Sequence, residues 1–112
     1  MRAVVRGDDV NCQRGGKEVH AADVAQAVGL LLSADAAVIT GQAFNCYDRY
    51  ISEFEVATMA KNITGSASSI TGESKQPQHQ IVTEKLRGLG MAFGGEALLE
   101  KTVRELIAAA GA

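Results

Sequence analysis

The spacing of apolar residues predicts two amphipathic helices in the middle of the chain. Over residues 22–33, apolar side chains recur every three or four positions, and Asp23 suits the positively polarised start of a helix. The second helix has the clearer signal, because Ser52 and Glu55 form a Ser-x-x-Glu capping box at its start. Behind that box lies one apolar stripe made of Val56, Met59, Ala60 and Ile63. Gly65 stands where a left-handed C-cap would end this helix.

A third amphipathic helix is predicted near the end of the sequence. Its apolar face consists of Leu98, Leu99, Val103, Leu106 and Ile107. On the opposite, charged face, Glu100 and Arg104 are four residues apart, in the order that favours an ion pair. Thr83 is expected to cap a shorter helix over residues 83–86, which a glycine closes.

Short strands are expected between these helices. Residues 2–5 and 17–20 contain valines and flank a turn, so they predict two strands that could pair with each other. Residues 43–47 predict a third strand, which the polar pair Asp48 and Arg49 ends.

The overall composition is that of one ordinary folded domain. The chain has 112 residues, of which 46% are hydrophobic and 21% are charged. The polar connection over residues 64–80 leaves room for one more short strand at residues 69–71. We therefore expect an α/β fold of an α+β-like kind, with three main helices and a few short strands in one small domain over residues 1–112.

The balance of charge and the cysteine content narrow the classes of partner and location. A formal net charge of −2 gives no electrostatic basis for binding nucleic acid or an anionic membrane surface. No apolar stretch approaches the length of a membrane span, and no signal peptide is visible, so we expect a cytoplasmic protein. Cys12 and Cys46 lie outside any Cys-x-x-Cys spacing. A cytoplasmic location favours two reduced thiols over the alternative, a single disulfide.

Two glycine-rich segments resemble phosphate-binding loops, but their spacing does not support that interpretation. In residues 88–95 the third glycine comes one position late for a dinucleotide fingerprint, so we expect a helix-to-helix turn. In residues 15–17, Gly-Gly-Lys lacks the upstream glycine and the following Ser or Thr of a phosphate loop, so we expect a hairpin turn. His20 and His79 are the only histidines, and their spacing does not predict a metal site.

Four segments in order resemble the C-terminal region of the NAD-dependent epimerase/dehydratase family, which belongs to the extended short-chain dehydrogenases. Val19-His20 followed by Asp23-Val-Ala resembles that family's Val-His-Val-x-Asp-Val-Ala segment. Residues 41–52 resemble its next strand and the start of its Ser-capped helix, which residues 55–65 continue. Residues 85–103 are similar to its closing Lys-x-x-x-Leu-Gly helix and final helix. The resemblance spans nearly the whole chain.

The resemblance implies a substrate-side region without its own catalytic centre. In this family a Rossmann domain binds NAD or NADP, and a Tyr-x-x-x-Lys pair transfers the proton. Both precede the region that this chain resembles, and here Tyr47 and Tyr50 are followed four positions later by Ile51 and Phe54. We therefore expect a truncated or stand-alone homologue of the substrate-binding region of a nucleotide-sugar epimerase/dehydratase. It would bind no cofactor and transfer no hydride by itself.

The same resemblance directs attention to four residues that could contact a nucleotide sugar. Family members often hold the diphosphate with an arginine four residues before the motif histidine, and Gly16 occupies that position here. The candidate substrate-binding residues are Arg14, Lys17, His20 and Lys75. Asp23 is expected to cap a helix and to take no part in chemistry.

The sequence is also compatible with two further functions. The chain could be an assembly module that forms a homo-oligomer through an exposed edge strand at residues 43–47 or through apolar helix faces. Less favoured is a small enzyme with an unrelated site near His20, together with Asp23, Asp48 and Lys17.

Overall fold

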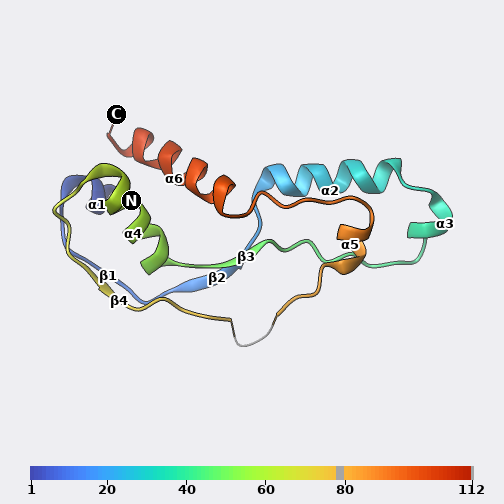
Figure 1. The fold of residues 1–112 in the computed structure, drawn as a ribbon, viewed down its shortest axis with the longest axis horizontal. Coiled ribbons are helices and arrows are strands. Elements are labelled where there is room, and N and C mark those ends of the chain that lie inside the picture. The colour runs from blue at the N-terminus through green and yellow to red at the C-terminus, as the bar shows by residue number, and fades with distance from the viewer. Residues whose placement is uncertain (78–79, 112) are drawn as a thin grey trace.

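The computed structural model describes residues 1–77 and 80–111, which form a mixed fold of helices and short strands (Figure 1). In chain order the elements are α1 (Arg2–Arg6), β1 (Val10–Cys12), β2 (Gly15–Glu18), α2 (Ala21–Ser33), α3 (Ala36–Ile39), β3 (Arg49–Ser52), α4 (Glu53–Thr64), β4 (Ile70–Gly72), α5 (Glu84–Gly88) and α6 (Gly95–Gly111). The long helices are α2, α4 and α6, so the mixed fold class with three main helices is confirmed.

The strands form two separate two-stranded sheets. β1 pairs in parallel with β4, with Val10 opposite Ile70. β2 pairs antiparallel with β3, with Gly15 opposite Ser52. β4 lies within one residue of the short strand predicted at residues 69–71. The second pair, which we call the β2–β3 ladder, joins strands separated in sequence by α2 and α3, and it lies at the middle of the molecule (Figure 1).

The prediction of a strand at residues 2–5 is wrong, because α1 occupies that segment. Val4 is 3% exposed and packs in a core cluster against α4 and α6, and this tertiary packing overrides the strand preference of valine. Gly7, in the left-handed region at φ 84°, ends the helix. The Ser66 hydroxyl donates to the Val4 carbonyl oxygen and ties α1 to the loop before β4. The predicted partner strand, residues 17–20, overlaps only the end of β2, which pairs with β3.

The predicted strand at residues 43–47 is also wrong. The described segment has no ladder partner, and β3 begins at Arg49, where the sequence suggested that a strand would end. Phe44 and Cys46 pack beside the buried Leu86, and the Asn45 amide donates to the Val82 carbonyl oxygen at 3.0 Å. These side-chain contacts, rather than a sheet, hold the segment.

The predicted helices form where they were expected, although α5 and α6 extend beyond the predicted segments and the caps differ in detail. The Ser52 hydroxyl accepts from the Glu55 amide at 3.1 Å, and Gly65 ends α4 at φ 68°. The other half of the capping box does not form, because the Glu55 carboxylate pairs with Arg49 at 2.6 Å. Similarly, Thr83 precedes α5, but its hydroxyl accepts from the Arg87 side chain instead of capping the helix.

The last helix follows its predicted pattern. α6 buries Val103 at 1% exposure, and its charged face carries the expected ion pair between Glu100 and Arg104 at 2.9 Å. α6 packs against α1 and α4.

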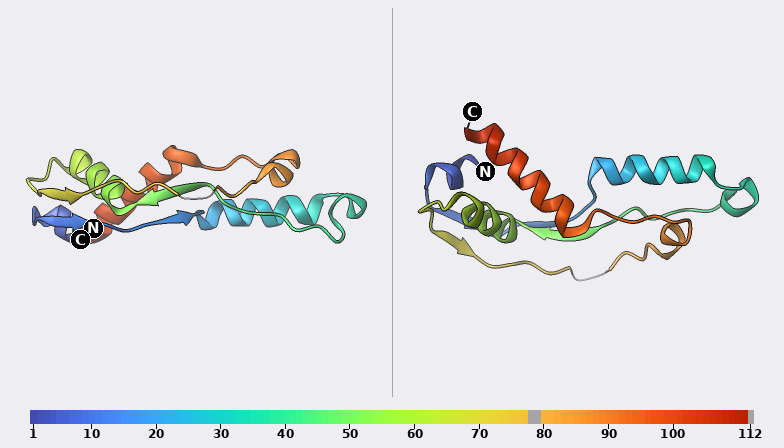
Figure 2. Two further views of the ribbon diagram at one scale, coloured as in Figure 1. Left: turned by 90° about the horizontal axis from the view of Figure 1, so that it is seen from below. Right: turned by 45° about the horizontal axis from the view of Figure 1, so that its top comes forward.

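The molecule is long and thin, and its apolar residues form two clusters. Its principal extents are 55 × 32 × 15 Å, which Figure 2 shows edge-on. The radius of gyration is 17.1 Å, whereas a compact chain of this length has about 13 Å. The first cluster joins α1, α4 and α6 around Val4, Ala60 and Val103. The second joins α2 and α5 around Ala27 and Leu86.

Two carboxylates connect these clusters at the start of α6. Both oxygens of the Asp23 carboxylate accept from the Gly94 amide, at 3.2 and 3.0 Å. The Asp48 carboxylate accepts from the Gly95 amide at 2.9 Å. We call this arrangement the carboxylate clamp. It places two negative charges at the positively polarised end of a 17-residue helix, where they are stabilising. Asp23 was expected to cap α2, but His20 takes that position.

We predict that the clamp contributes measurably to stability. Asp23→Ala leaves the Gly94 amide in a site from which water is largely excluded, since Asp23 is 5% exposed. The expected loss in the free energy of unfolding is about 2 kcal/mol, measured by urea denaturation. Asp8→Ala is the matched control: it removes only the exposed ion pair with Arg6 and should cost less than about 1 kcal/mol. Equal losses in the two variants would contradict this role.

Candidate functional site

A hollow of about 560 Å³ lies where the start of α4 meets β1 and the β2–β3 ladder. We call it the α4 groove. Its polar lining consists of Asn11, Arg14, Glu18, Ser52 and Glu53. Its apolar lining includes Val4, Val10, Cys12, Ile51, Val56 and Ala57. A concave surface with an apolar floor and a few polar groups is typical of small-molecule sites.

Close contacts within and beside the β2–β3 ladder fix the shape of this groove. The Glu53 amide, in the first turn of α4, donates to the Arg14 carbonyl oxygen at 2.8 Å. A side chain at position 15 would begin 2.6 Å from the Tyr50 hydroxyl oxygen, so any residue other than glycine would have to displace that ring. The neighbouring Gly16 is more open, and its nearest contact would be the Glu18 carboxylate at 3.1 Å.

The lining of the α4 groove carries charged groups of both signs. Arg14 is the one Lys or Arg side chain among the described lining residues, whereas Glu18 and Glu53 are both acidic. Burial raises the pKa of the Cys12 thiol, the Glu53 carboxylate raises it further, and the N-terminal ammonium group of Met1 lowers it in part. With the N-terminal ammonium group of Met1, which also belongs to the lining, the groove holds two acidic and two basic groups.

The structure places the four predicted substrate residues in different surroundings. Arg14 lines the α4 groove. Lys17 is exposed on β2 and pairs with Tyr50 in the register of the β2–β3 ladder. The Nδ1 atom of His20 accepts from the Ala22 amide at 2.9 Å, which makes His20 the N-cap of α2.

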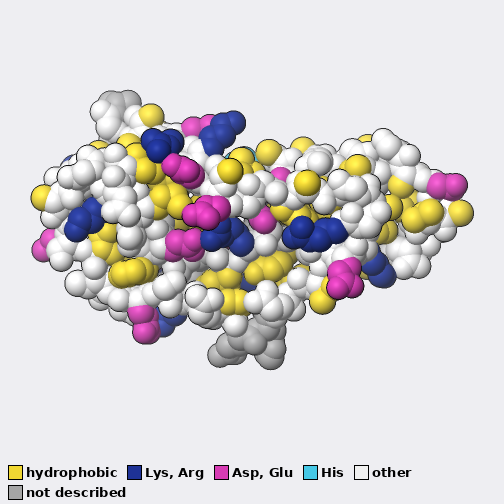
Figure 3. Space-filling model, viewed as in Figure 1, with side chains coloured by type: hydrophobic (Ala, Val, Ile, Leu, Met, Phe, Trp, Pro, Cys, Tyr) yellow, Lys and Arg dark blue, Asp and Glu magenta, His cyan; other side chains and the backbone are white. Residues whose placement is uncertain are grey.

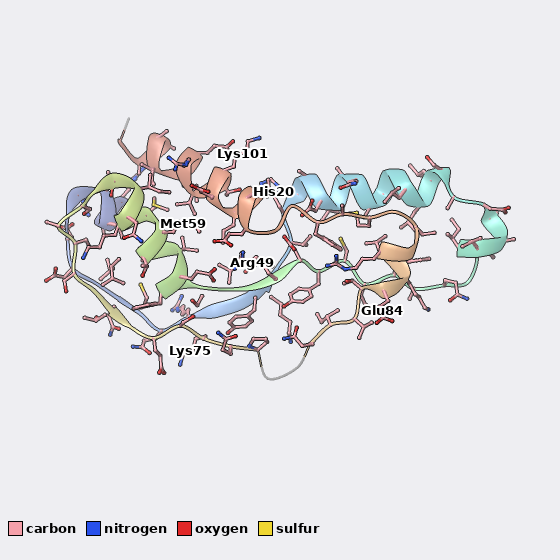
Figure 4. All side chains as sticks on the ribbon, viewed as in Figure 1. His20, Arg49, Met59, Lys75, Glu84 and Lys101 are labelled. Atoms are coloured by element: carbon pink, nitrogen blue, oxygen red, sulfur yellow. The ribbon has the colours of Figure 1, made fainter. Side chains whose placement is uncertain are left out.

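Lys75 lies apart from His20. It forms an ion pair with Glu73 at 3.2 Å. Figure 4 shows His20 and Lys75 on opposite sides of the β2–β3 ladder, with Arg49 between them. The fold therefore does not gather the four residues into one site.

A second, smaller hollow of about 270 Å³ includes His20. Its other polar lining residues are Glu18, Asp48, Arg49 and Thr102, and its apolar wall comes mainly from α6. The Asp48 carboxylate already accepts from Gly95, and Arg49 already pairs with Glu55. These side chains therefore have structural roles.

The residues proposed for an unrelated enzyme also have structural partners. Asp23 and Asp48 form the carboxylate clamp, and His20 caps α2. Within residues 1–77 and 80–111, no group of three or more His, Cys, Asp or Glu side chains is arranged to hold a metal ion. His79 lies outside the described residues.

The glycine-rich segments differ in how closely they match expectation. Residues 89–94 connect α5 to α6, so the predicted helix-to-helix turn is confirmed. Gly15 and Gly16 belong to β2 itself, and the expected hairpin turn at residues 15–17 is wrong. Gly16 and Lys17 instead pair with Ile51 and Tyr50.

Sequence reasoning missed the acidic members of the groove. Glu18 and Glu53 were not singled out, although strand alternation would have placed Gly16 and Glu18 on one face of β2. Identification of Ser52 as an N-cap also located the start of α4. What the sequence did not reveal is that Arg14 meets this helix start through the pairing of β2 with β3.

Comparisons with known proteins found no matching family model, no matching curated protein and no matching solved structure. Among the described residues, no helix combines the length and apolar character needed to cross a membrane.

The two thiols are free and belong to different apolar clusters, Cys12 to the first and Cys46 to the second. Burial raises the pKa of Cys46, and the Asp23 carboxylate raises it further. Both folded-state values are therefore above those of the unfolded chain. The resulting stability is present below the ordinary thiol pKa and is lost as pH rises through the folded value.

We predict that alkylation of Cys46 by iodoacetamide begins at a higher pH in the folded protein than in urea. Asp23→Asn should lower the folded-state pKa of Cys46, because it removes the nearby negative charge. The pKa of Cys12 serves as the internal control and should not change, since its neighbouring carboxylate is Glu53. Peptide mass spectrometry over a pH series measures both thiols, and identical shifts at the two sites would contradict the assignment.

Proposed function

We propose that this chain is a substrate-side lobe of the kind found at the C-terminal end of NAD-dependent epimerases and dehydratases. In this proposal it binds a sugar-containing ligand in the α4 groove and transfers no hydride by itself. One observation carries the proposal: Gly16, which the sequence resemblance aligns with a diphosphate-binding arginine, lines the α4 groove together with Arg14. Two independent arguments, the resemblance and the geometry, thus point to the same surface.

The lining of the groove suits a sugar. Asn11 and Arg14 supply polar groups for sugar hydroxyls, and the aliphatic floor suits the apolar face of a pyranose ring. The volume falls within the range of about 300–1,000 Å³ that is usual for small-molecule sites.

The proposal excludes dehydrogenase chemistry for this chain alone. Hydride transfer needs a bound nicotinamide and an acid–base group beside it. Neither tyrosine has a lysine four positions later, and the glycine spacing does not match a dinucleotide fingerprint. We also propose a cytoplasmic location, which agrees with two free thiols.

We predict that simple sugars shift amide resonances around the α4 groove in a ¹⁵N-labelled sample, whereas NAD produces no binding heat in calorimetry. Arg14→Ala should weaken sugar binding about threefold to tenfold, because it removes a charged donor from the groove. Lys101→Ala, which changes an exposed cation on α6, is the control and should bind as the unmodified chain does.

Micromolar binding of NAD would contradict the proposal. So would sugar-induced shifts confined to residues outside the α4 groove.

A second candidate function is self-assembly, which the surface of α2 favours. Val24, Val28 and Leu32 are 40%, 49% and 82% exposed and follow one face of the helix. Asp23 is the only charged residue of α2, and it is buried. Hydrophobic side chains reach the surface over α2 and at the tip near α3 (Figure 3).

A second copy of the chain fits this stripe. In an antiparallel pair centred on Val28, Val24 of each copy faces Leu32 of the other, so that smaller and larger side chains alternate. The absence of exposed charge on α2 removes like-charge repulsion between the copies. The predicted edge strand is not a route to assembly, since residues 43–47 form no strand.

We predict that sedimentation of the unmodified chain shows a dimer that grows with concentration, and that Val28→Lys abolishes it. A buried lysine at the centre of the contact lacks a partner and therefore disfavours association. Val82→Lys changes an equally apolar residue outside α2, 62% exposed, and should leave the dimer intact. A monomer at every concentration would exclude this second function.

A further inference from the structure

The hollow of about 270 Å³ beside His20 bears on how two copies of the chain pair. We propose that, in the antiparallel pair formed through α2, the tip of each copy covers this hollow in the other copy. The tip consists of residues 34–39, which include α3. The inference rests on self-assembly, the second of the proposed functions, and adds to it a contact outside α2.

The tip is apolar and lies at one end of the long axis of the molecule (Figure 1). From Val24 to Tyr47, Asp35 is the only charged residue in the sequence. Val38 on α3 is 54% exposed, and Leu32, just before the tip, is 82% exposed. Exposed apolar surface with so little charge is typical of a surface that a protein partner covers.

The register of the α2 pair determines where the tip of the second copy lies. Because Val24 of one copy faces Leu32 of the other, Ser33 is level with Asp23, in the first turn of the opposite helix. The residues that follow α2 in one copy therefore come next to the residues that precede α2 in the other. His20 is the last of these, and it lies between α6 and the start of α2 (Figure 4).

The hollow presents an apolar wall to the incoming tip. His20 lines it on the side of α2, and Leu98 and Leu106 line it from α6. Leu106 is 47% exposed, although it belongs to the apolar face of its helix. Contact between Leu106 and Val38 of the second copy removes both side chains from water, which stabilises the pair through the hydrophobic effect.

The single charge of the tip is compatible with this contact. In the pair, Asp35 comes close to Ala21 of the other copy, at the positively polarised start of α2, where a carboxylate is stabilising. The acidic groups of the hollow have partners of their own. Glu18 lies across from the basic Arg49 in the register of the β2–β3 ladder, and Asp48 accepts from the first amide of α6.

The area that a stable dimer buries also favours a contact beyond α2. A helix of 13 residues is about 20 Å long and about 10 Å wide, so its contact face covers roughly 200 Å². A stable protein interface buries about 800 Å² on each partner. Because a two-fold pair repeats every contact, the tip contact forms twice and extends the buried surface at both ends of α2.

Crosslinking between two populations of the chain tests the contact directly. A ¹⁵N-labelled chain with Val38→Cys is mixed with an unlabelled chain with Leu106→Cys and treated with a short bismaleimide. We expect mass spectrometry to find a crosslink between positions 38 and 106 that joins a labelled to an unlabelled peptide. In the control, Lys101→Cys on the charged face of α6 replaces Leu106→Cys and should give no such crosslink.

Sedimentation of two charge variants measures how much the contact contributes. Leu106→Lys and Val38→Lys each place an ammonium group in the tip contact. Both sites are about half exposed in the single copy, so the fold should be retained. We expect each variant to weaken dimerisation about tenfold for each of the two equivalent contacts, or about a hundredfold in all. Lys101→Ala should leave the dimer unchanged.

The outcomes separate this inference from self-assembly itself. If Val28→Lys abolishes the dimer but no crosslink joins positions 38 and 106, the copies pair through α2 alone and the tip contact is wrong. Leu106→Lys that dimerises as tightly as the unmodified chain contradicts the tip contact as well. A crosslink that forms equally with Lys101→Cys reflects random collision and also overturns it. If the unmodified chain is a monomer at every concentration, both proposals fail.

Discussion

The carboxylate clamp is the interaction on which the arrangement of this molecule depends. Asp23 comes from the first turn of α2 and Asp48 from the residue before β3, yet both accept from amides at the start of α6. An elongated chain with two small apolar clusters has little buried surface at its middle. Charge-assisted hydrogen bonds therefore stabilise the middle of the molecule, where a continuous apolar core would do so in a compact protein. Because Asp48 directly precedes β3, the clamp also ties the start of that strand to α6.

The parts of the fold that depend on local chemistry could be predicted from the sequence. The Ser52 cap, the Gly65 C-cap and the apolar stripes located α2, α4 and α6 correctly, because each signal acts within a few residues. The strands were predicted less accurately than the helices, because strand pairing depends on segments that are distant in sequence. Residues 2–5 favour a strand by composition but form α1, as its contacts with α4 and α6 outweigh the preference of valine.

The candidate site was only partly predictable for the same reason. Arg14 was predicted as a candidate ligand residue and lines the groove, but its neighbours Glu18 and Glu53 reach the groove through β2–β3 pairing and the start of α4. Lys17, His20 and Lys75 were grouped by chemistry and by resemblance, and the fold disperses them. The charge of the groove thus emerges from tertiary structure.

Hydrogen exchange of the Gly94 and Gly95 amides tests most directly whether the clamp organises the molecule. Both amides lie at the first turn of a helix, where no intrahelical acceptor exists, so only the two carboxylates protect them. The account predicts that they exchange as slowly as amides in the middle of α6, through opening of the whole structure. Exchange as fast as that of the exposed Gly41 amide would show that the clamp does not hold, and the arrangement of the two clusters would then need another explanation.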